Sequence, residues 1–319
     1  MRSCRKATTE QAAKILLSAR NVALFAHTRP DGDTVGACVA LRLALKKLGV
    51  NAEIFCDMAL GDPFVAFPET SAVTSEFFGK YDLYVAVDCG DVFRLGEFAG
   101  IYDKQTCTLT IDHHGGEYYS RDNCVLPYAS CCQIIYEILK AANVALDKDV
   151  ATYLYMGLCT DTGSFAHSNT DKACFEMAAD LVDYCVDVTF INRVFFKDAS
   201  LKKTKLLGRA LSNLRTYHDG KLVVVFATSG DMDAVGASES DAEGLVQFAV
   251  DVSEAVVGVS LCQHGENCYK VSMRGKNFDV RRVCAAFGGG GHVNASGCMI
   301  SGFFEDVVEK IVREIGFYL

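Results

Sequence analysis

The 319-residue sequence lacks several features that would assign it to a membrane or secreted class. No apolar run reaches the roughly 18 residues that a membrane-spanning helix requires. The opening residues, Met1-Arg-Ser-Cys-Arg-Lys, lead into a polar amphipathic segment instead of the apolar stretch of a secretory signal. Repeats and low-complexity segments are absent as well. We therefore expect a soluble, cytoplasmic protein with no membrane partner.

Cys-x-x-Cys pairs are also absent, although the chain has 15 cysteines. The odd count in a long chain without a secretory signal argues against a disulfide framework, and the missing pair spacing argues against a zinc cluster. We expect reduced cysteines that are mostly buried as small apolar residues.

The chain has fewer basic than acidic residues. Lysine and arginine total 31 against 40 acidic residues, which gives a net charge of −9. Proteins that hold long duplexes neutralise phosphates with many Lys and Arg side chains, so this balance argues against a long duplex nucleic acid as partner. Small anionic substrates remain open, because metal ions and one or two arginines can hold their phosphates.

The length and the patterning predict two α/β domains. A chain of this length exceeds the usual size of one domain, about 100 to 200 residues, and its 50% apolar content can fill two cores. We expect an N-terminal domain over 1–187, built on a mainly parallel sheet flanked by helices. A helical linker over 188–209 leads to a smaller domain over 210–319 with a mixed sheet.

Periodicity places the elements of the first domain. The apolar runs 22–26, 83–87 and 107–111 are typical of buried parallel strands. Thr8-x-x-Gln11 is a capping pattern that predicts a helix over 8–19. A helix over 33–48 and a strand over 51–55 would form a βαβ unit. Further helices are expected over 130–142, 148–159 and 171–184.

The second domain shows turn signals between short apolar runs. His218-Asp-Gly220 and the segment 264–267 each separate two strand-like runs, which predicts two hairpins. A short helix over 280–287 leads into a run of glycines that ends at His292, and an amphipathic helix over 304–315 closes the chain.

Acidic and histidine side chains gather where the elements of the first domain end. His27, Asp31 and Asp33 follow the first apolar run, Asp88 follows the second, and Asp112-His113-His114 follows the third. Asp161 opens a glycine-containing turn after the helix that is expected to end at Cys159. The carboxyl ends of parallel strands form the ligand crevice of such sheets.

These residue types predict a dinuclear metal site. Asp and neutral His suit divalent ions of borderline hardness, with Mn²⁺ favoured and Mg²⁺, Fe²⁺ or Co²⁺ as alternatives. A carboxylate can bridge two ions about 3.5 to 4 Å apart, and such a pair activates water and neutralises a phosphoryl group. Each motif alone could be a turn or a helix cap, but their joint occurrence favours hydrolysis of a phosphate ester or anhydride.

The motif set resembles that of a known family. His27-x-x-x-Asp31-x-Asp33, Asp88, Asp112-His113-His114, Asp161-Thr-Gly-Ser-Phe165 and the Gly288–His292 run are similar to the motifs of the DHH phosphoesterase superfamily. Within it, the chain resembles the short DHH plus DHHA1 enzymes, the group of oligoribonucleases (nanoRNases) that includes pAp phosphatases. The resemblance covers nearly the whole chain and is specific to the superfamily, but much less specific to one substrate.

The resemblance implies six metal ligands: His27, Asp31, Asp33, Asp88, His113 and Asp161. The first two would bind one ion, while Asp33 and His113 would bind the other. Asp88 would bridge them and Asp161 would complete the coordination. His114 would lie near the scissile phosphate as a hydrogen-bond donor or proton source.

The same resemblance implies residues that orient groups or bind the substrate. Asp112 would orient a neighbouring side chain, and Arg94 would either orient its loop or form a surface ion pair. Arg274 would hold a phosphate that is not cleaved, through a bidentate contact, and Lys276 could assist. The glycine run would allow a nucleotide to approach the backbone closely. Its expected binding residues are Gly289, Gly290, Gly291 and His292.

The expected activity is hydrolysis of short single-stranded oligoribonucleotides to mononucleotides, and of pAp to AMP. A cyclic-dinucleotide or pApA phosphodiesterase is the alternative enzyme. An inorganic pyrophosphatase is less favoured, because its second domain lacks the glycine-histidine signature, and a RecJ-like nuclease would need additional regions. The alternative outside enzymes is a nucleotide-sensing module without turnover. A homodimer is compatible with the sequence, which does not fix the oligomeric state.

Overall fold

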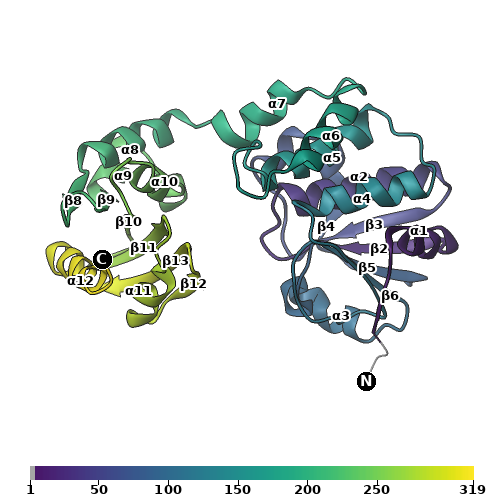
Figure 1. The fold of residues 1–319 in the computed structure, drawn as a ribbon, viewed down its shortest axis with the longest axis horizontal. Coiled ribbons are helices and arrows are strands. Elements are labelled where there is room, and N and C mark those ends of the chain that lie inside the picture. Colours follow the sequence, from purple (N-terminus) through teal and green to yellow (C-terminus); the bar gives the residue numbers. More distant parts are fainter. Residues whose placement is uncertain (1–3) are drawn as a thin grey trace. The chain divides into compact units, whose positions relative to one another are not determined.

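The computed structural model describes residues 4–319. The chain divides into two compact units, Met1–Asp198 and Ala199–Leu319, which are coloured purple to teal and green to yellow in Figure 1. The division lies within the segment 188–209, where both Ile191 and Leu206 are fully buried. In the described part of the chain, no helix is long and apolar enough to cross a membrane.

The first unit is built on a seven-stranded sheet in which all paired strands run parallel. The strand order is β1-β7-β6-β5-β2-β3-β4, so the direction of winding reverses between β2 and β5. In open parallel sheets, ligands bind at such a reversal, outside the carboxyl ends of the strands. The strands are β1 (Arg5–Lys6), β2 (Asn21–Phe25), β3 (Asn51–Phe55), β4 (Val73–Thr74), β5 (Leu83–Val87), β6 (Thr108–Asp112) and β7 (Asp122–Val125).

Helices and loops cover both faces of this sheet. Figure 1 shows α2, α4 and α5 on one side of the sheet and α3 on the other. Burial on both sides explains why the sequence of β2 and β5 is apolar without alternation. The helices are α1 (Thr9–Ser18), α2 (Gly32–Lys47), α3 (Ala99–Asp103), α4 (Cys131–Ala141), α5 (Lys148–Asp161), α6 (Lys172–Val182) and α7 (Val188–Asn192).

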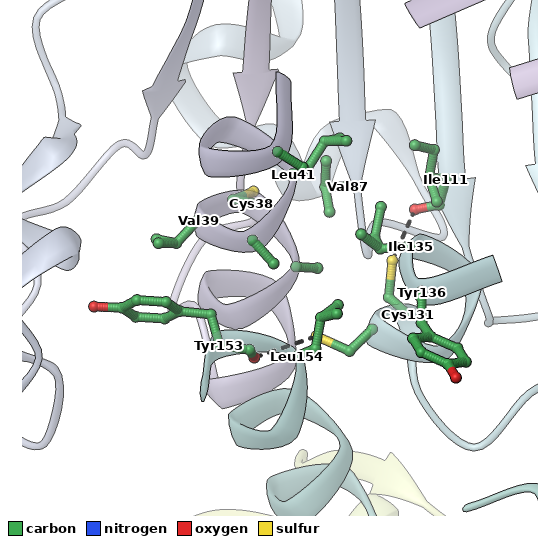
Figure 2. Close-up of a cluster of buried hydrophobic side chains, with 14 of the residues drawn as sticks. Cys38, Val39, Leu41, Val87, Ile111, Cys131, Ile135, Tyr136, Tyr153 and Leu154 are labelled. Atoms are coloured by element: carbon green, nitrogen blue, oxygen red, sulfur yellow. Dashed lines mark hydrogen bonds between the residues drawn. The ribbon is translucent and has the colours of Figure 1, made fainter. Parts of the chain in front are cut away.

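Two separate cores lie against the two faces. On one face, side chains of α2, α4 and α5 pack against Val87 and Ile111 (Figure 2). On the other face, Phe25 and Phe55 anchor an aromatic cluster in which their ring centroids lie 5.6 Å apart. Eleven of the cysteines are buried, which confirms that they serve mainly as small apolar residues.

The local signals for the first helices are confirmed. Thr8 caps α1, and Gln11 completes the predicted capping box. Asp31 caps α2 by accepting hydrogen bonds from the backbone amides of Asp33 and Thr34. The expected end of α5 at Cys159 is wrong, because the helix continues through Asp161.

The contact between α2 and α5 depends on glycines. A Cβ atom on Gly36 would lie 2.5 Å from the carbonyl oxygen of Tyr153, and a Cβ on Gly157 would lie 2.5 Å from Oδ1 of Asp33. The two helix backbones therefore touch, which larger residues would prevent. This close approach positions the start of α2, which carries Asp33, against α5, whose last residue is Asp161.

The second unit has a mixed six-stranded sheet in the order β12-β13-β11-β10-β9-β8. Only β9 and β10 pair in parallel, and both predicted hairpins, β8 with β9 and β10 with β11, are confirmed. The strands are β8 (Arg215–Tyr217), β9 (Leu222–Ala227), β10 (Val257–Gln263), β11 (Cys268–Gly275), β12 (Gly290–His292) and β13 (Ala295–Ser301).

Helices of the second unit bury both faces of its sheet. Leu206 and Ala210 of α8 (Leu201–Ser212) pack with α9 (Ser229–Val235) and α10 (Leu245–Val250) in one core. The other core contains side chains of α11 (Val280–Ala286) and α12 (Phe304–Gly316). The fold class is thus confirmed: a parallel sheet flanked by helices, joined in the same chain to a smaller α/β unit with a mixed sheet.

Replacing Gly36 by alanine is expected to destabilise the first unit by about 1 to 3 kcal/mol, because the methyl group collides with backbone that cannot rotate away. This outweighs the gain of about 1 kcal/mol that alanine brings to a helix interior. Urea unfolding measures the effect. The matched control is Gly100→Ala in α3, where nothing lies within 4 Å of the new Cβ. Equal stability of the two variants would show that the helices are not in backbone contact.

Candidate metal centre

Two neighbouring strands deliver the central residues of the site. His27 follows β2 and Asp88 follows β5, at the reversal of strand order. Both side chains are buried. Asp88 adopts a left-handed backbone conformation with φ of 57°, which is uncommon for a residue with a side chain.

The six predicted ligands come together in two groups, and Asp88 links them because a ligand atom of Asp88 also lies within 4.8 Å of those of His113 and His114. His27, Asp31 and Asp88 place ligand atoms within 4.8 Å of one another, and so do Asp33, His113 and Asp161. Oδ2 of Asp88 lies 3.6 Å from Nε2 of His27, whereas Oδ1 of Asp88 lies 3.4 Å from Nε2 of His113. The two oxygens of Asp88 therefore face two different histidines.

Backbone carbonyls orient both histidines. Nδ1 of His27 lies 2.7 Å from the carbonyl oxygen of Thr28, and Nδ1 of His113 lies 3.1 Å from that of Tyr128. Because a carbonyl can only accept, each Nδ1 donates its proton, which leaves Nε2 of the neutral ring as the nitrogen that can bind a metal. Holding the second ring nitrogen in this way is typical of histidines that bind metals.

Three buried atoms at the centre of the site have no hydrogen-bond partner: Nε2 of His27, Nε2 of His113 and Oδ1 of Asp88. Leaving a buried polar atom unsatisfied costs about 1 to 3 kcal/mol, so native proteins rarely do it without a functional reason. Imidazole lone pairs and a carboxylate oxygen that converge on one region are suitable ligands for divalent cations. The residues therefore fit a metal centre.

The start of α4 binds the carboxylate of Asp33 through hydrogen bonds, a contact that the sequence motifs did not predict. The backbone amides of Cys131 and Cys132 donate to its two oxygens at 2.5 and 2.9 Å. An anion at a helix N-terminus is stabilised by free amides and by the helix dipole. Thr34 was missed as well, and its hydroxyl donates to Oδ2 of Asp88 at 2.6 Å. In the sequence, Thr34 is marked only by its position next to Asp33, and Cys131 and Cys132 only by their position at the expected start of a helix.

The acidic groups are crowded, and their pKa values reflect it. Burial, followed by the charges of Asp33 and Asp31, raises the pKa of Asp161 to about 9. Burial and the charge of Asp88 likewise raise the pKa of Asp33 well above its usual range. Burial opposes ionisation of Asp88 too, but interactions with His113, His27 and Thr34 outweigh burial and lower its pKa. A cation among these carboxylates would relieve their mutual repulsion.

Asp112 and His114 form a neighbouring pair. Oδ1 of buried Asp112 accepts hydrogen bonds from the backbone amides of His113 and His114 and lies 2.9 Å from Nδ1 of His114. The His114 side chain is 43% exposed, and its Nδ1 lies 3.5 Å from Oδ1 of Asp88. Asp112 thus fixes the imidazole at the edge of the site and leaves Nε2 of His114 free to meet a ligand.

Arg94 belongs to the same region of the first unit. Burial favours a lower pKa for His27, but the Asp88 carboxylate and the Thr28 carbonyl outweigh burial and raise this pKa. The positive charge of the Arg94 guanidinium opposes that rise. The carbonyl of Arg94 accepts a hydrogen bond from the Thr28 amide at 2.7 Å, so the loop that carries Arg94 is tied to the loop after His27.

The predicted substrate residues of the second unit occupy two places. Arg274 lines a cavity of about 300 Å³ with Lys270 and Ser272, and its guanidinium donates to the carbonyl of Met273. The ammonium of Lys276 donates to the carbonyl of Val252 at 2.8 Å.

The glycine run is partly a strand. Gly290, Gly291 and His292 form β12, which pairs with β13 at the edge of the sheet. A Cβ on Gly289 would lie 2.3 Å from the carbonyl oxygen of Gly297, so packing on β13 already requires glycine there. The exposed side of β12 still leaves His292 accessible.

The fold and the site together define a class of protein. Residues 21–158 match the model described as the DHH family, N-terminal domain. A solved structure, an exopolyphosphatase-related protein from Bacteroides fragilis, superposes with a TM-score of 0.87 and covers 97% of this chain and 96% of its own, at 22% identity, which shows a common fold. The first unit therefore contains a DHH family domain.

Curated relatives match over almost their full length. The Mycoplasma genitalium protein named bifunctional oligoribonuclease and PAP phosphatase NrnA is 26% identical, with 98% of this chain and 99% of the relative covered. The protein of the same name from Thermus thermophilus is 29% identical over 91% of this chain and 88% of its own. This chain is similar to these two proteins along both units.

In the metal-free protein, Asp161→Asn is expected to raise the melting temperature at pH 8. The folded-state pKa of Asp161 is about 9 against an ordinary value of 3.8. Between these values the unfolded chain releases a proton that the folded chain retains, so the stability of the natural protein falls as pH rises through this window. Asparagine does not titrate, so its advantage should grow from pH 5 to pH 8.

Thermal unfolding in EDTA at the two pH values measures the effect, for which we expect about 2 to 4 °C at pH 8, or roughly 1 kcal/mol. Asp183→Asn, on the exposed surface, should show no such pH-dependent gain. Added Mn²⁺ should stabilise the natural protein more than Asp161→Asn, because a ligand is lost. A destabilised Asp161→Asn protein at pH 8 in EDTA would contradict the described crowding.

Proposed function

We propose that the protein is a metal-dependent phosphodiesterase that hydrolyses short oligoribonucleotides to mononucleotides and also converts pAp to AMP. The observation that carries this proposal is the Asp88 carboxylate, whose two oxygens face Nε2 of His27 and Nε2 of His113, two buried ring nitrogens without hydrogen-bond partners. The names of the full-length relatives support the substrate class. The location in the cytoplasm and a homodimer stay predictions.

The residues divide between two metal positions. His27 and Asp31 would hold one ion, Asp33, His113 and Asp161 would hold the other, and Asp88 would contact both. We favour Mn²⁺, with Mg²⁺, Fe²⁺ and Co²⁺ as alternatives. Divalent ions in such a pair supply an activated water and neutralise the charge that develops on a phosphoryl group.

The remaining site residues of the first unit are proposed to orient the metal ligands or to donate hydrogen bonds to the substrate. Thr34 holds one oxygen of Asp88 and thereby fixes the plane of the shared carboxylate. His114, fixed through Nδ1 by Asp112, is proposed to donate a hydrogen bond or a proton to the leaving oxygen of the substrate. Arg94 is proposed to orient its loop and to bind a phosphate.

Substrate binding by the second unit is proposed for the residues that carry donors there: Arg274, Lys276, Gly289, Gly290, Gly291 and His292. Arg274 would hold a phosphate that is not cleaved, since a guanidinium can donate two parallel hydrogen bonds to one phosphate. The open edge of β12 offers backbone donors in addition. Because these contacts do not involve the scissile bond, they would act on affinity.

One turnover panel tests the proposal. Diadenylate, longer oligoribonucleotides, pAp, pApA and cyclic di-AMP are incubated with Mn²⁺, and with EDTA as control. Mononucleotide release from short RNA, abolished by EDTA, is the expected result. Preference for pApA or the cyclic dinucleotide would replace short RNA by those substrates, and binding without any product would support a sensor module instead.

Asp88→Ala and His113→Ala are each expected to reduce turnover by at least roughly 100-fold, because each removes a metal ligand. Neither side chain fills the apolar core, so circular dichroism should show folded protein in both cases. Asp183→Ala on the exposed surface is the matched control with unchanged turnover. If both variants kept most of their activity, the assignment of Asp88 and His113 as metal ligands would be ruled out.

Arg274→Ala is expected to raise KM for diadenylate about 10-fold or more and to change kcat much less, because a charge-assisted contact to a phosphate outside the reaction is lost. Steady-state kinetics separates the two constants. Arg281→Ala is the control, since Arg281 lies in the same unit and pairs with Asp279 on its own helix end. If KM is unchanged for every phosphorylated substrate, Arg274 has no part in binding.

A further inference from the structure

Phe93 is exposed in a way that packing does not explain. Its side chain is 81% exposed, the highest value among the large apolar side chains within residues 4–319. Leu95 and Phe98, in the same short helical segment Val92–Phe98, are buried in the aromatic core below the sheet. The segment thus buries Leu95 and Phe98, partly buries Val92, and leaves one aromatic ring in solvent, at a cost in apolar exposure.

The backbone around Phe93 is fixed by hydrogen bonds. Its amide donates to the side chain of Asp91 at 2.7 Å, and the amide of Arg94 donates to the carbonyl of Asp91 at 3.1 Å. The carbonyl of Arg94 in turn accepts from the amide of Thr28 at 2.7 Å. Leu95, two residues after Phe93, is fully buried. The backbone therefore holds the ring of Phe93 outward, and its exposure is not a consequence of a loose loop.

The segment that carries Phe93 borders the metal centre on two sides. Thr28, which bonds to Arg94, directly follows His27 in the chain. At the start of the same loop, a Cβ on Gly90 would lie 3.3 Å from Cβ of His114. The loop from Asp88 to Arg94 therefore runs between the His27 side and the His114 side, and two residue steps and one hydrogen bond separate Phe93 from His27.

We propose that Phe93 is a stacking platform for a nucleobase of the substrate, a role that rests on the nucleotide hydrolysis proposed above. An exposed aromatic face binds any base, because every base presents a π-face, and such stacking requires no positive charge. This suits a chain with a net charge of −9. The platform would favour nucleotides over inorganic pyrophosphate or polyphosphate, which carry phosphate but no ring.

The sequence contains no tryptophan, so Phe93→Trp would introduce the only indole of the protein and keep an aromatic face. Its fluorescence is titrated, in Mn²⁺, with AMP and with ribose 5-phosphate, which differ only by the base. AMP should quench the fluorescence strongly by stacking, whereas ribose 5-phosphate should not. Phe78→Trp is the control, since Phe78 is 72% exposed and lies before β5 instead of after it; neither ligand should quench it.

Kinetics supplies the second readout. Phe93→Ala should raise KM for diadenylate roughly 5- to 100-fold, the usual effect of removing one stacked ring, with kcat little changed. Phe93→Tyr should restore the natural KM, and Phe78→Ala should leave it unaltered. For a diadenylate analogue that lacks a base at the stacked position, natural protein and Phe93→Ala should have the same KM.

The outcomes separate the platform from the activity. Equal quenching by AMP and ribose 5-phosphate, or an unchanged KM in Phe93→Ala, would overturn the platform while leaving hydrolysis intact. A Phe93→Ala protein that loses a dimer in light scattering, without any change in nucleotide binding, would also overturn it and assign the ring to contact with a second copy. Quenching specific to AMP in a protein that hydrolyses no nucleotide would support the platform and refute the proposed activity.

Discussion

The buried carboxylate of Asp88, shared between two imidazoles, is the constraint on which the rest of the site depends. It lies where the strand order of the first sheet reverses, so β2 and β5 bring His27 and Asp88 together without further elements. The other ligands need helices: α4 donates hydrogen bonds from two backbone amides to Asp33, and the glycine contact between α2 and α5 allows Asp161 to approach. Concentrating acidic groups in this way is unfavourable without a cation, and the apolar cores of the unit offset that cost.

Much of the fold could be predicted from the sequence, because the strongest signals are local. The apolar runs of β2 and β5 and the turn at His218-Asp-Gly220 each depend on neighbouring residues alone. Several strands escaped prediction, among them two that lack such a signal. Arg5–Lys6 is a two-residue charged strand at the edge of the sheet, and β7 is largely polar. Both form because an existing sheet offers them backbone partners, which only the tertiary structure reveals.

The candidate site shows the same division. Its six acidic and histidine residues could be selected because motif spacing and strand ends mark them, and the structure does bring them together. The contacts that hold these residues in place could not be predicted from the sequence. The amides of Cys131 and Cys132 reach Asp33 across 98 and 99 residues of chain, and no sequence pattern reports a backbone donor. In the same way, no pattern in the glycine run predicts a strand, whereas pairing with β13 makes part of it one.

The most direct test of the shared carboxylate is the number of metal ions that the protein binds. Calorimetric titration of the metal-free protein with Mn²⁺, checked by elemental analysis after dialysis, gives this stoichiometry. Two ions per chain are expected for the natural protein, and fewer than two for Asp88→Asn, since both positions use this carboxylate. A natural protein that binds no ion or only one, or an Asp88→Asn protein that binds two with undiminished affinity, would contradict the account.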